Sequence, residues 1–459
     1  MSRATTFVIG TIALIAIGVV VTVLLARDTL EPAAGFLARE VCNEHFVGGR
    51  EPEVIRAQDM VRYDPNLSLI SAEIEQEPAA VVAGFGPLYR MRAVHRPGYG
   101  CTLVRGSLAP VPELEPVTAI PWVRAEAAQS GFDSKALEAA LDQVFTDPLP
   151  NHRALLIAHQ GALITERYAP GFNAGTPMLS FSMAKSITAM MVGAAMVQGL
   201  IALDDRPPIA AWADPQDPRH EISWRHLLQM QSGLELQEQY TDLSADVPQM
   251  NIMAHAAGAY AINKPLLHPP GTHWQYSTGT SNILQTALRT ALEQAEVDYH
   301  RFAQQALFAP LGTGSVVLVP DSSGTFIGGS YAYATAADWA RLGQLYLQDG
   351  RHEGQQMLPA GFAAFTATAA SDSDGRYGAQ VWLNQDGATG RERYFPTLPK
   401  SSYFFSGWQG QVVIIIPDWD MVIVHLGRTP EDHRELDPIN AALERLVPSF
   451  PFSGPGNSA

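Results

Sequence analysis

The chain of 459 residues has little lysine, little cysteine and few positive charges. Only four of its 30 basic residues are lysines, so its usual cation is arginine, which cannot act as a base in proteins. The formal net charge of −16 argues against nucleic acid and against anionic membrane surfaces as partners. A hydrophobic content of 46% is nevertheless sufficient for a large core.

The two cysteines, Cys42 and Cys101, both lie in the first quarter of the chain. In an exported protein an isolated pair predicts a disulfide, and the alternative is two unrelated buried thiols. Neither cysteine is accompanied by histidines at metal-ligand spacing, so the sequence predicts no zinc or iron site and no cofactor.

Residues 7–26 form an uncharged apolar run, long enough to cross a bilayer as a helix. A cleaved signal peptide is the alternative, but Leu24-Leu25-Ala26 gives no good cleavage site. The sequence therefore predicts a cytoplasmic tail over residues 1–6 and a transmembrane signal anchor over 7–26. The few flanking charges place the bulk of the chain outside, on the periplasmic side of a bacterial inner membrane.

The rest of the chain divides at a proline-studded linker. We expect an N-terminal extracytoplasmic segment over residues 27–120, a main domain over 121–449 and a flexible tail over 450–459. Two predicted hairpins, over 154–168 and 411–426, lie near the ends of the main domain with helical patterns between them. This order predicts an α+β fold in which the terminal strands share one antiparallel sheet, flanked by helices and an all-helical region.

The tetrapeptide Ser182-Met183-Ala184-Lys185 precedes a long apolar run. Residues three apart on a helix share a face, so the Lys185 amine can reach the Ser182 hydroxyl. Burial would lower the pKa of Lys185 and allow it to take the serine proton. The alternative is a capping serine beside a solvated lysine, yet no other lysine here follows a serine by three residues.

Two further motifs follow in order, Pro270–Thr278 with the pattern Pro-Gly-x-x-x-x-Tyr-x-Thr, and Ser406–Gln411 entering the second hairpin. Together with Ser182–Lys185 they resemble the penicillin-recognising serine hydrolases of the class C β-lactamase-related group, over roughly residues 125–448. Two segments, Ser180–Ser186 and Gln239–Asp242, are similar to the branch of 6-aminohexanoate-dimer hydrolases and Ser-x-x-Lys carboxylesterases.

The resemblance implies a β-lactamase/transpeptidase-like fold and a role for each motif. Ser182 is the expected nucleophile, Lys185 helps to deprotonate it and holds the Tyr276 oxygen, and Tyr276 passes the proton to the leaving group. The expected oxyanion hole combines the Ser182 backbone N–H with that of Phe405 or Ser406. The implied activity is cleavage of small esters or linear amides through an acyl-enzyme.

The chain departs from the family pattern at two places. Thr278 stands where asparagine is commonest, and Ser402–Phe404 stands where the family has Lys-Thr-Gly. Without that lysine, efficient turnover of β-lactams or D-Ala-D-Ala substrates is not expected. Expected substrate contacts are Thr278, Tyr240, Gly407 and Trp408, although Tyr240 and Trp408 could equally be a loop aromatic and a packing residue.

Two alternatives remain open from the sequence. One is a D-amino-acid peptidase or β-lactamase-like enzyme acting on peptidoglycan-type substrates. An Arg428 that binds a substrate carboxylate would support this alternative. The other is a non-catalytic sensor of the same fold. The sequence contains no Gly-x-Ser-x-Gly or His-Glu-x-x-His motif, which disfavours α/β-hydrolase and zinc peptidase chemistry. It leaves the oligomeric state open.

Overall fold

The computed structural model describes residues 27–62, 64–147, 151–429 and 436–452. The tail and membrane helix expected over residues 1–26 lie outside these residues. Within the described part of the chain, no helix is both long and apolar enough to cross a bilayer. The longest helical stretch there, residues 27–46, carries six charged side chains. The predicted membrane anchor is therefore wrong as an element of this structure, and the extracytoplasmic location that depended on it is withdrawn.

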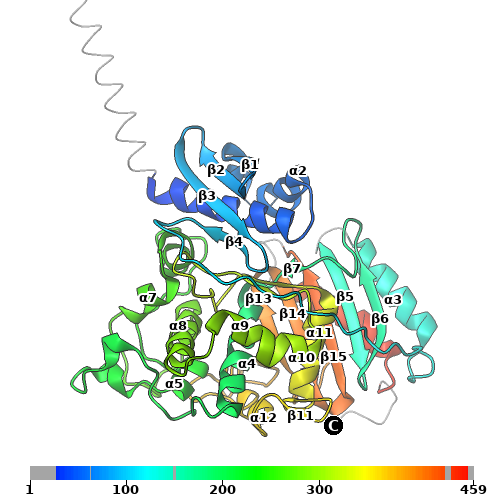
Figure 1. Ribbon diagram of the computed structural model, residues 1–459. Helices are drawn as coiled ribbons and strands as arrows, with labels where there is room; N and C mark the ends of the chain where they lie inside the picture. Colours follow the sequence, from blue (N-terminus) through cyan, green and yellow to red (C-terminus); the bar gives the residue numbers. More distant parts are fainter. Residues whose placement is uncertain (1–26, 63, 148–150, 430–435, 453–459) are drawn as a thin grey trace, which may run out of the picture.

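Residues 27–103 form an N-terminal unit, in which helices pack on a small antiparallel sheet of order β1-β2-β3-β4 (Figure 1). After the helical residues 27–46, its elements are α2 (Pro52–Ile55), η1 (Arg56–Val61), η2 (Pro65–Leu69), β1 (Ser71–Gln76), β2 (Ala79–Phe85), β3 (Leu88–Arg96) and β4 (Gly100–Leu103).

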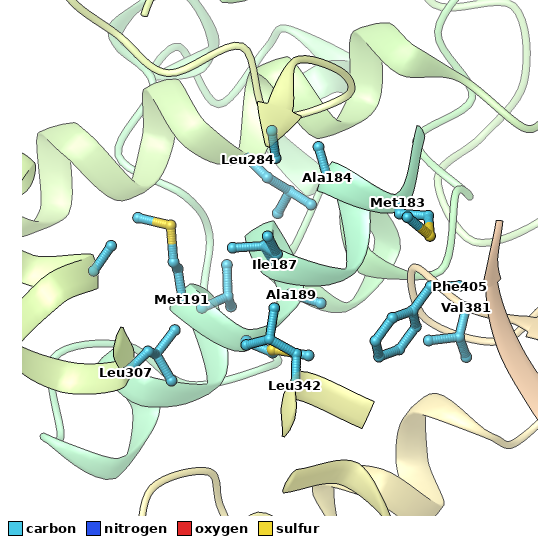
Figure 2. Close-up of a cluster of buried hydrophobic side chains, with 14 of the residues drawn as sticks. Met183, Ala184, Ile187, Ala189, Met191, Leu284, Leu307, Leu342, Val381 and Phe405 are labelled. Atoms are coloured by element: carbon cyan, nitrogen blue, oxygen red, sulfur yellow. The ribbon is translucent and has the colours of Figure 1, made fainter. Parts of the chain in front are cut away.

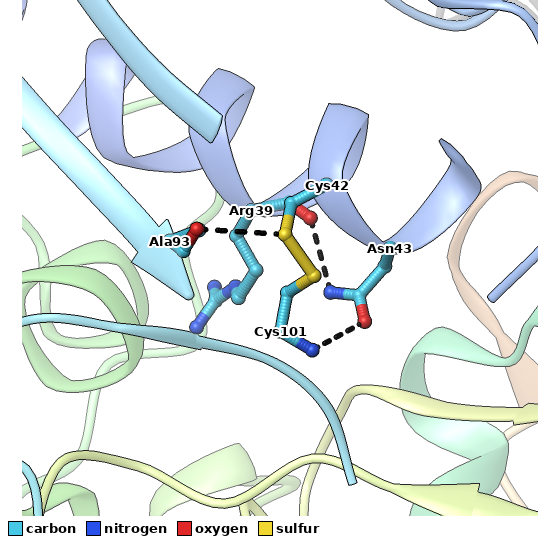
Figure 3. Close-up of a disulfide and its surroundings, with 5 residues drawn as sticks. All are labelled: Arg39, Cys42, Asn43, Ala93 and Cys101. Carbon is cyan, nitrogen blue, oxygen red and sulfur yellow. Dashed lines mark hydrogen bonds between the residues drawn. A yellow bond between two sulfur atoms is a disulfide. The ribbon is translucent and has the colours of Figure 1, made fainter. Parts of the chain in front are cut away.

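A disulfide joins the first helix of this unit to its last strand (Figure 3). Cys42 and Cys101 are fully buried and bonded, which confirms the predicted pair. The side chain of Asn43 supports the link, because its oxygen accepts from the Cys101 backbone N–H at 2.8 Å and its nitrogen donates to the Arg39 carbonyl at 3.0 Å.

An extended segment, residues 104–123, leads from the N-terminal unit along the rest of the chain. Ala109 N–H donates to the Ser322 carbonyl at 2.8 Å, and Ile120 N–H donates to the Gly312 carbonyl at 3.2 Å. Because this segment packs along the part of the chain that follows it, its packing does not mark a boundary at residue 120, and the boundary expected there stays a prediction.

The main sheet has six antiparallel strands in the order β12-β13-β14-β15-β5-β6. Their bounds are β5 (His152–His159), β6 (Ala162–Tyr168), β12 (Trp382–Leu383), β13 (Tyr403–Gly407), β14 (Gln411–Ile416) and β15 (Met421–Gly427). β15 pairs with β5 from Met421 opposite His159 onward. The pairing of strands from both ends of the main domain confirms the predicted α+β sheet.

Alternate residues of the central strands enter two separate cores, as the period of a strand requires. Ile414 and Ile423 face the core of α3 (Ser134–Thr146) and α13 (Asp437–Leu446). Val413 and Val422 face the larger core that contains the central helices. Because helices cover both faces, these strands read in the sequence as continuous apolar runs.

The region between β6 and β12 is mainly helical. Its α-helices are α4 (Ala184–Val197), α5 (Trp224–Leu228), α6 (Asp246–Pro248), α7 (Ala257–Ile262), α8 (Thr278–Gln294), α9 (Tyr299–Ala303), α10 (Ala309–Leu311), α11 (Ala336–Leu347) and α12 (Phe362–Thr366). Its other helical turns are η3 (Phe181–Met183), η4 (Ala210–Trp212), η5 (Pro218–Glu221), η6 (Gln249–Met253) and η7 (Gln304–Phe308), and its short strands are β7 (Met178–Leu179), β8 (Val317–Leu318), β9 (Ala332–Ala334), β10 (Arg351–His352) and β11 (Gln355–Gln356). Nearer the C-terminus lie the turns η8 (Trp408–Gly410), η9 (Pro417–Trp419) and η10 (Val447–Ser449).

Helix α4 lies in the middle of the larger core. Nearly all of its side chains are buried, which explains why its sequence shows an apolar run rather than one apolar stripe. Figure 2 shows Ile187 and Met191 of α4 among Leu284 of α8, Leu307 of η7 and Leu342 of α11. Packing on every side fixes the position of the residues at the start of α4.

Candidate active site

Ser182 and Lys185 lie at the start of α4. Ser182 occupies the short 3-10 turn η3, and Lys185 lies in the first turn of the α-helix. The Lys185 Nζ donates to the Ser182 Oγ at 2.9 Å, so the contact expected from their spacing is present. The preceding residue, Phe181, has a φ of +44°, a strained backbone for a bulky residue and one that often marks functional sites.

Lys185 is 1% exposed and is surrounded by acceptors. In addition to Ser182, its Nζ donates to the Thr278 Oγ1 at 2.9 Å and to the Gly329 carbonyl at 2.8 Å. Burial lowers the pKa of Lys185 to about 8, and the negative charge of Glu238 opposes that shift. A substantial neutral fraction is therefore present at mildly alkaline pH, as a proton acceptor requires.

Tyr276 also lies beside the lysine. The Lys185 Nζ is 4.8 Å from the centroid of the Tyr276 ring. That ring packs against Tyr377 and Trp382, with centroid distances of 5.6 and 5.0 Å. The structure thus brings together all three residues expected to react, with the lysine over the face of the phenol ring.

Glu238 is a residue of this site that the sequence reasoning missed. Its Oε1 accepts from the Thr278 Oγ1 at 2.6 Å and its Oε2 from the Thr278 N–H at 2.7 Å, at the start of α8. The Tyr240 hydroxyl also donates to Glu238 Oε1, at 2.7 Å. In the sequence, only the position of Glu238 two residues before Tyr240 could have indicated that it belongs to the site. Gly329 was missed too, because a carbonyl contact leaves no mark in the sequence.

Strand β13 runs close to the turn that carries Ser182. A Cβ added to Gly407 would lie 2.0 Å from the Ser180 carbonyl oxygen, so only glycine permits this approach. The Phe405 side chain is fully buried, 5.3 Å from the Tyr346 ring, whereas Ser406 is partly exposed. The residues expected to supply the second oxyanion N–H are therefore on a strand adjacent to the nucleophile.

A cavity of about 380 Å³ opens beside Ser182. Tyr240 and Trp408 line it and stack on each other with ring centroids 5.8 Å apart. Trp408 also meets Phe181 edge to face at 5.2 Å. Two of the expected substrate contacts thus share one wall, while Thr278 contacts the lysine instead. The lining includes residues of the N-terminal unit, which the sequence did not predict.

Arg428 does not line this cavity. It is 2% exposed, with its guanidinium 3.3 Å from Glu40 and 3.7 Å from Glu44 of the N-terminal unit. It also lies 5.1 Å from the centroid of the Phe181 ring. Burial raises the pKa of Glu40 to about 7 despite this partner. The arginine therefore joins the N-terminal unit to the Ser182 turn rather than meeting a ligand.

Among the described residues, no group of three or more histidine, cysteine, aspartate or glutamate side chains is placed to hold a metal ion.

Comparisons with known proteins agree with the motifs. A family model described as Beta-lactamase matches residues 153–445. A 6-aminohexanoate-dimer hydrolase from Paenarthrobacter ureafaciens is 25% identical over 351 residues, covering 70% of this chain and 82% of that protein. A candidate 6-aminohexanoate-dimer hydrolase from Bacillus anthracis has a similar fold, with a TM-score of 0.55, 19% identity and coverage of 72% of this chain and 89% of that one. EstCE1, a hydrolase with promiscuous acyltransferase activity, gives a TM-score of 0.54 at 16% identity over 68% of this chain and 98% of its own.

Proposed function

The chain belongs to the β-lactamase family and is a serine hydrolase of the esterase and amidase type, and we propose that it cleaves small esters or linear amides through an acyl-enzyme on Ser182. The observation that carries this proposal is the contact of 2.9 Å between the Ser182 Oγ and a fully buried Lys185 whose pKa is about 8. A hydroxyl beside a lysine that is partly neutral has a base within reach.

In the proposed acylation, neutral Lys185 takes the proton of Ser182 while the serine oxygen forms a bond to the carbonyl carbon. The oxyanion accepts hydrogen bonds from the Ser182 N–H and from the N–H of Phe405 or Ser406. Tyr276 then donates its phenol proton to the leaving oxygen or nitrogen, whose bond to carbon breaks, and Lys185 returns a proton to Tyr276. In deacylation, water gives a proton to neutral Lys185 while its oxygen forms a bond to the acyl carbon. The bond from that carbon to the Ser182 Oγ then breaks, the Oγ takes the proton back from Lys185, and the acid leaves.

The charge around the cavity disfavours acyl groups that carry a carboxylate. Its lining contains no lysine, arginine or histidine among the described residues, and its two charged members, Asp59 and Asp64, are both acidic. A substrate carboxylate would find no cation there. The relatives, a 6-aminohexanoate-dimer hydrolase and a hydrolase with promiscuous acyltransferase activity, support a proposal of linear amides and esters.

The peptidoglycan-directed alternative receives no support from the site. It needed a carboxylate-binding arginine, and Arg428 is occupied by the carboxylates of the N-terminal unit. The strand position of the family Lys-Thr-Gly motif carries no cation either. We therefore retain esterase or amidase activity, and the non-catalytic sensor becomes an outcome of the experiment below.

The first experiment is intact-mass labelling of the full chain with a fluorophosphonate, which bonds to activated serines. We expect one adduct in the wild type and none in Ser182→Ala. Ser186→Ala is the matched control, because this buried serine of α4 donates to the Gln380 carbonyl at 2.8 Å and should not affect labelling. A folded wild-type protein that takes no label would favour the sensor.

A second variant separates the proton donor from the fold. Tyr276→Phe removes one oxygen but keeps the ring that packs on Tyr377 and Trp382. We expect kcat to fall by about 10²–10⁴-fold, the usual contribution of general acid–base catalysis, with little change in the melting temperature. Turnover at the wild-type rate would remove Tyr276 from the mechanism.

A further inference from the structure

The cavity at Ser182 lies between two parts of the chain that are far apart in sequence. One wall comes from the N-terminal unit, through Ala33, Phe36 and Leu67, and a second comes from the segment around Val247 and Ile252. We propose that this cavity is an acyl pocket for neutral, apolar acyl groups of about six to eight carbons, and that the N-terminal unit sets this specificity. The inference rests on the proposed function.

The two walls are fixed to each other. The Arg39 guanidinium, on the first helix, donates to the Asn251 carbonyl at 2.7 Å, and Arg105, just after the last strand of the N-terminal unit, donates to the Met253 carbonyl at 2.9 Å. Ile252 packs into the core of the N-terminal unit, where a Cβ on Gly35 would lie 2.5 Å from its side chain. These contacts hold the two walls in a fixed relative position, so the pocket is part of the fold rather than a gap between independent parts.

The position of Tyr276 indicates which half of a substrate enters the cavity. Ser182 lines the cavity, but Tyr276 is not among the described residues that do. Tyr276 must meet the leaving group if it donates a proton to it. The leaving group then lies outside the cavity, on the side of Tyr377 and Trp382, and the acyl group extends inward from Ser182.

The lining selects against a carboxylate on the acyl group. Asp59 is 2% exposed and already bonded to Arg50 and Arg153, so it attracts no further cation. Asp64 is exposed at the lining and repels carboxylates. Most other lining side chains are apolar, so each methylene group of the substrate that moves from water into the cavity makes binding more favourable.

The volume sets the size of the acyl group. At about 380 Å³ the cavity is near the lower end of ordinary ligand pockets, which span roughly 300–1,000 Å³. At roughly 30 Å³ for a water-sized group, it holds about a dozen such groups if completely filled. A hexanoyl to octanoyl chain fits with room to adjust, whereas an acetyl group leaves most of the apolar surface unused.

The test is a series of p-nitrophenyl esters from acetate to octanoate on the full chain. We expect kcat/KM to rise about fourfold for each added methylene, until the cavity is filled. The p-nitrophenyl monoester of adipate has the six carbons of hexanoate with the terminal methyl group replaced by a carboxylate, and its kcat/KM should be at least about tenfold lower. These two comparisons need no variant, and a flat series or an equally good adipate ester would overturn the proposal.

The role of the N-terminal wall is tested by filling it. In Ala33→Phe we expect the octanoate-to-acetate ratio of kcat/KM to fall at least about tenfold. Thr29→Phe adds the same ring at an exposed position of the same helix and should leave the ratio unchanged. An unchanged ratio in folded Ala33→Phe would exclude the N-terminal unit from specificity. A folded wild-type protein that is not labelled by the fluorophosphonate would instead count against the proposed function.

Discussion

Glu238 and Lys185 are joined through a single hydroxyl group, that of Thr278. The Lys185 Nζ donates to the Thr278 Oγ1 at 2.9 Å, and this hydroxyl donates to the Glu238 carboxylate at 2.6 Å. The carboxylate charge raises the pKa of Lys185 while burial, the larger effect, lowers it. The family asparagine position, here Thr278, thus connects the candidate base to a carboxylate that limits how easily it loses its proton.

Replacing Glu238 tests that electrostatic role. In Glu238→Gln only burial acts, so the pKa of Lys185 falls further below 8. If neutral Lys185 is the base, kcat/KM rises with pH as the lysine deprotonates, and the midpoint of this rise should move to lower pH by roughly 0.5–1 unit. The pH profile of ester hydrolysis measures this midpoint.

The matched control for that variant is Glu235→Gln, an exposed carboxylate on the same loop. Its profile should coincide with that of the wild type. A Glu238→Gln protein that folds and keeps the wild-type midpoint would show that another group controls the pH dependence. A shift toward higher pH would mean that Glu238 does not oppose the deprotonation of Lys185.

The fold was largely predictable because its signals are local. The apolar runs of β14 and β15, the Gln160-Gly161 turn between β5 and β6, and the capping Asp133 before α3 each mark an element within a few residues. The Ser182–Lys185 contact follows from helical spacing in the same way.

The rest of the site depends on contacts between distant segments. Glu238 meets Thr278 across 40 residues from within a polar loop, and no periodic pattern marks it. Arg428 was open to interpretation as a ligand-binding residue because its partner Glu40 lies 388 residues away. The cavity wall from the N-terminal unit was hidden for the same reason, since tertiary packing alone brings it to Ser182.

Lys185 should leave a signature in the pH dependence of stability. Its pKa is about 8 in the folded protein, below the ordinary 10.5 that it regains on unfolding. Between these values the unfolded chain binds more protons, so the lysine contributes stability that increases as pH rises. Relative to Lys185→Met, the wild-type free energy of unfolding should therefore grow by about 1.4 kcal/mol per pH unit above pH 8.

Urea unfolding at several pH values from 7 to 10 measures this slope. Lys135→Met is the control, because this lysine is exposed on α3 and its removal should leave the pH dependence of the wild type. A constant difference between wild type and Lys185→Met would mean that the buried lysine keeps its proton throughout this range, which the proposed base cannot do.

Gly407 should be required for acylation rather than for folding alone. A methyl group at this position would lie 2.0 Å from the Ser180 carbonyl oxygen, so Gly407→Ala must push β13 away from the turn that carries Ser182. A displacement near 1 Å in the oxyanion hole costs about a hundredfold in rate. Gly175→Ala, at an exposed loop position, should retain wild-type kcat. Equal rates in the two variants would place the oxyanion donor elsewhere.

The disulfide should stabilise the acyl-pocket wall more than the main sheet. It links Cys42 to Cys101 over 59 residues, and removing such a crosslink typically costs about 2–4 kcal/mol. In Cys42→Ala/Cys101→Ala the N-terminal unit should therefore unfold before the six-stranded sheet, which calorimetry would record as an earlier, separate transition. Between the two transitions, octanoate hydrolysis should decline more steeply than acetate hydrolysis, because the longer chain uses the N-terminal wall. One transition at the wild-type temperature, with parallel loss of both activities, would contradict this coupling.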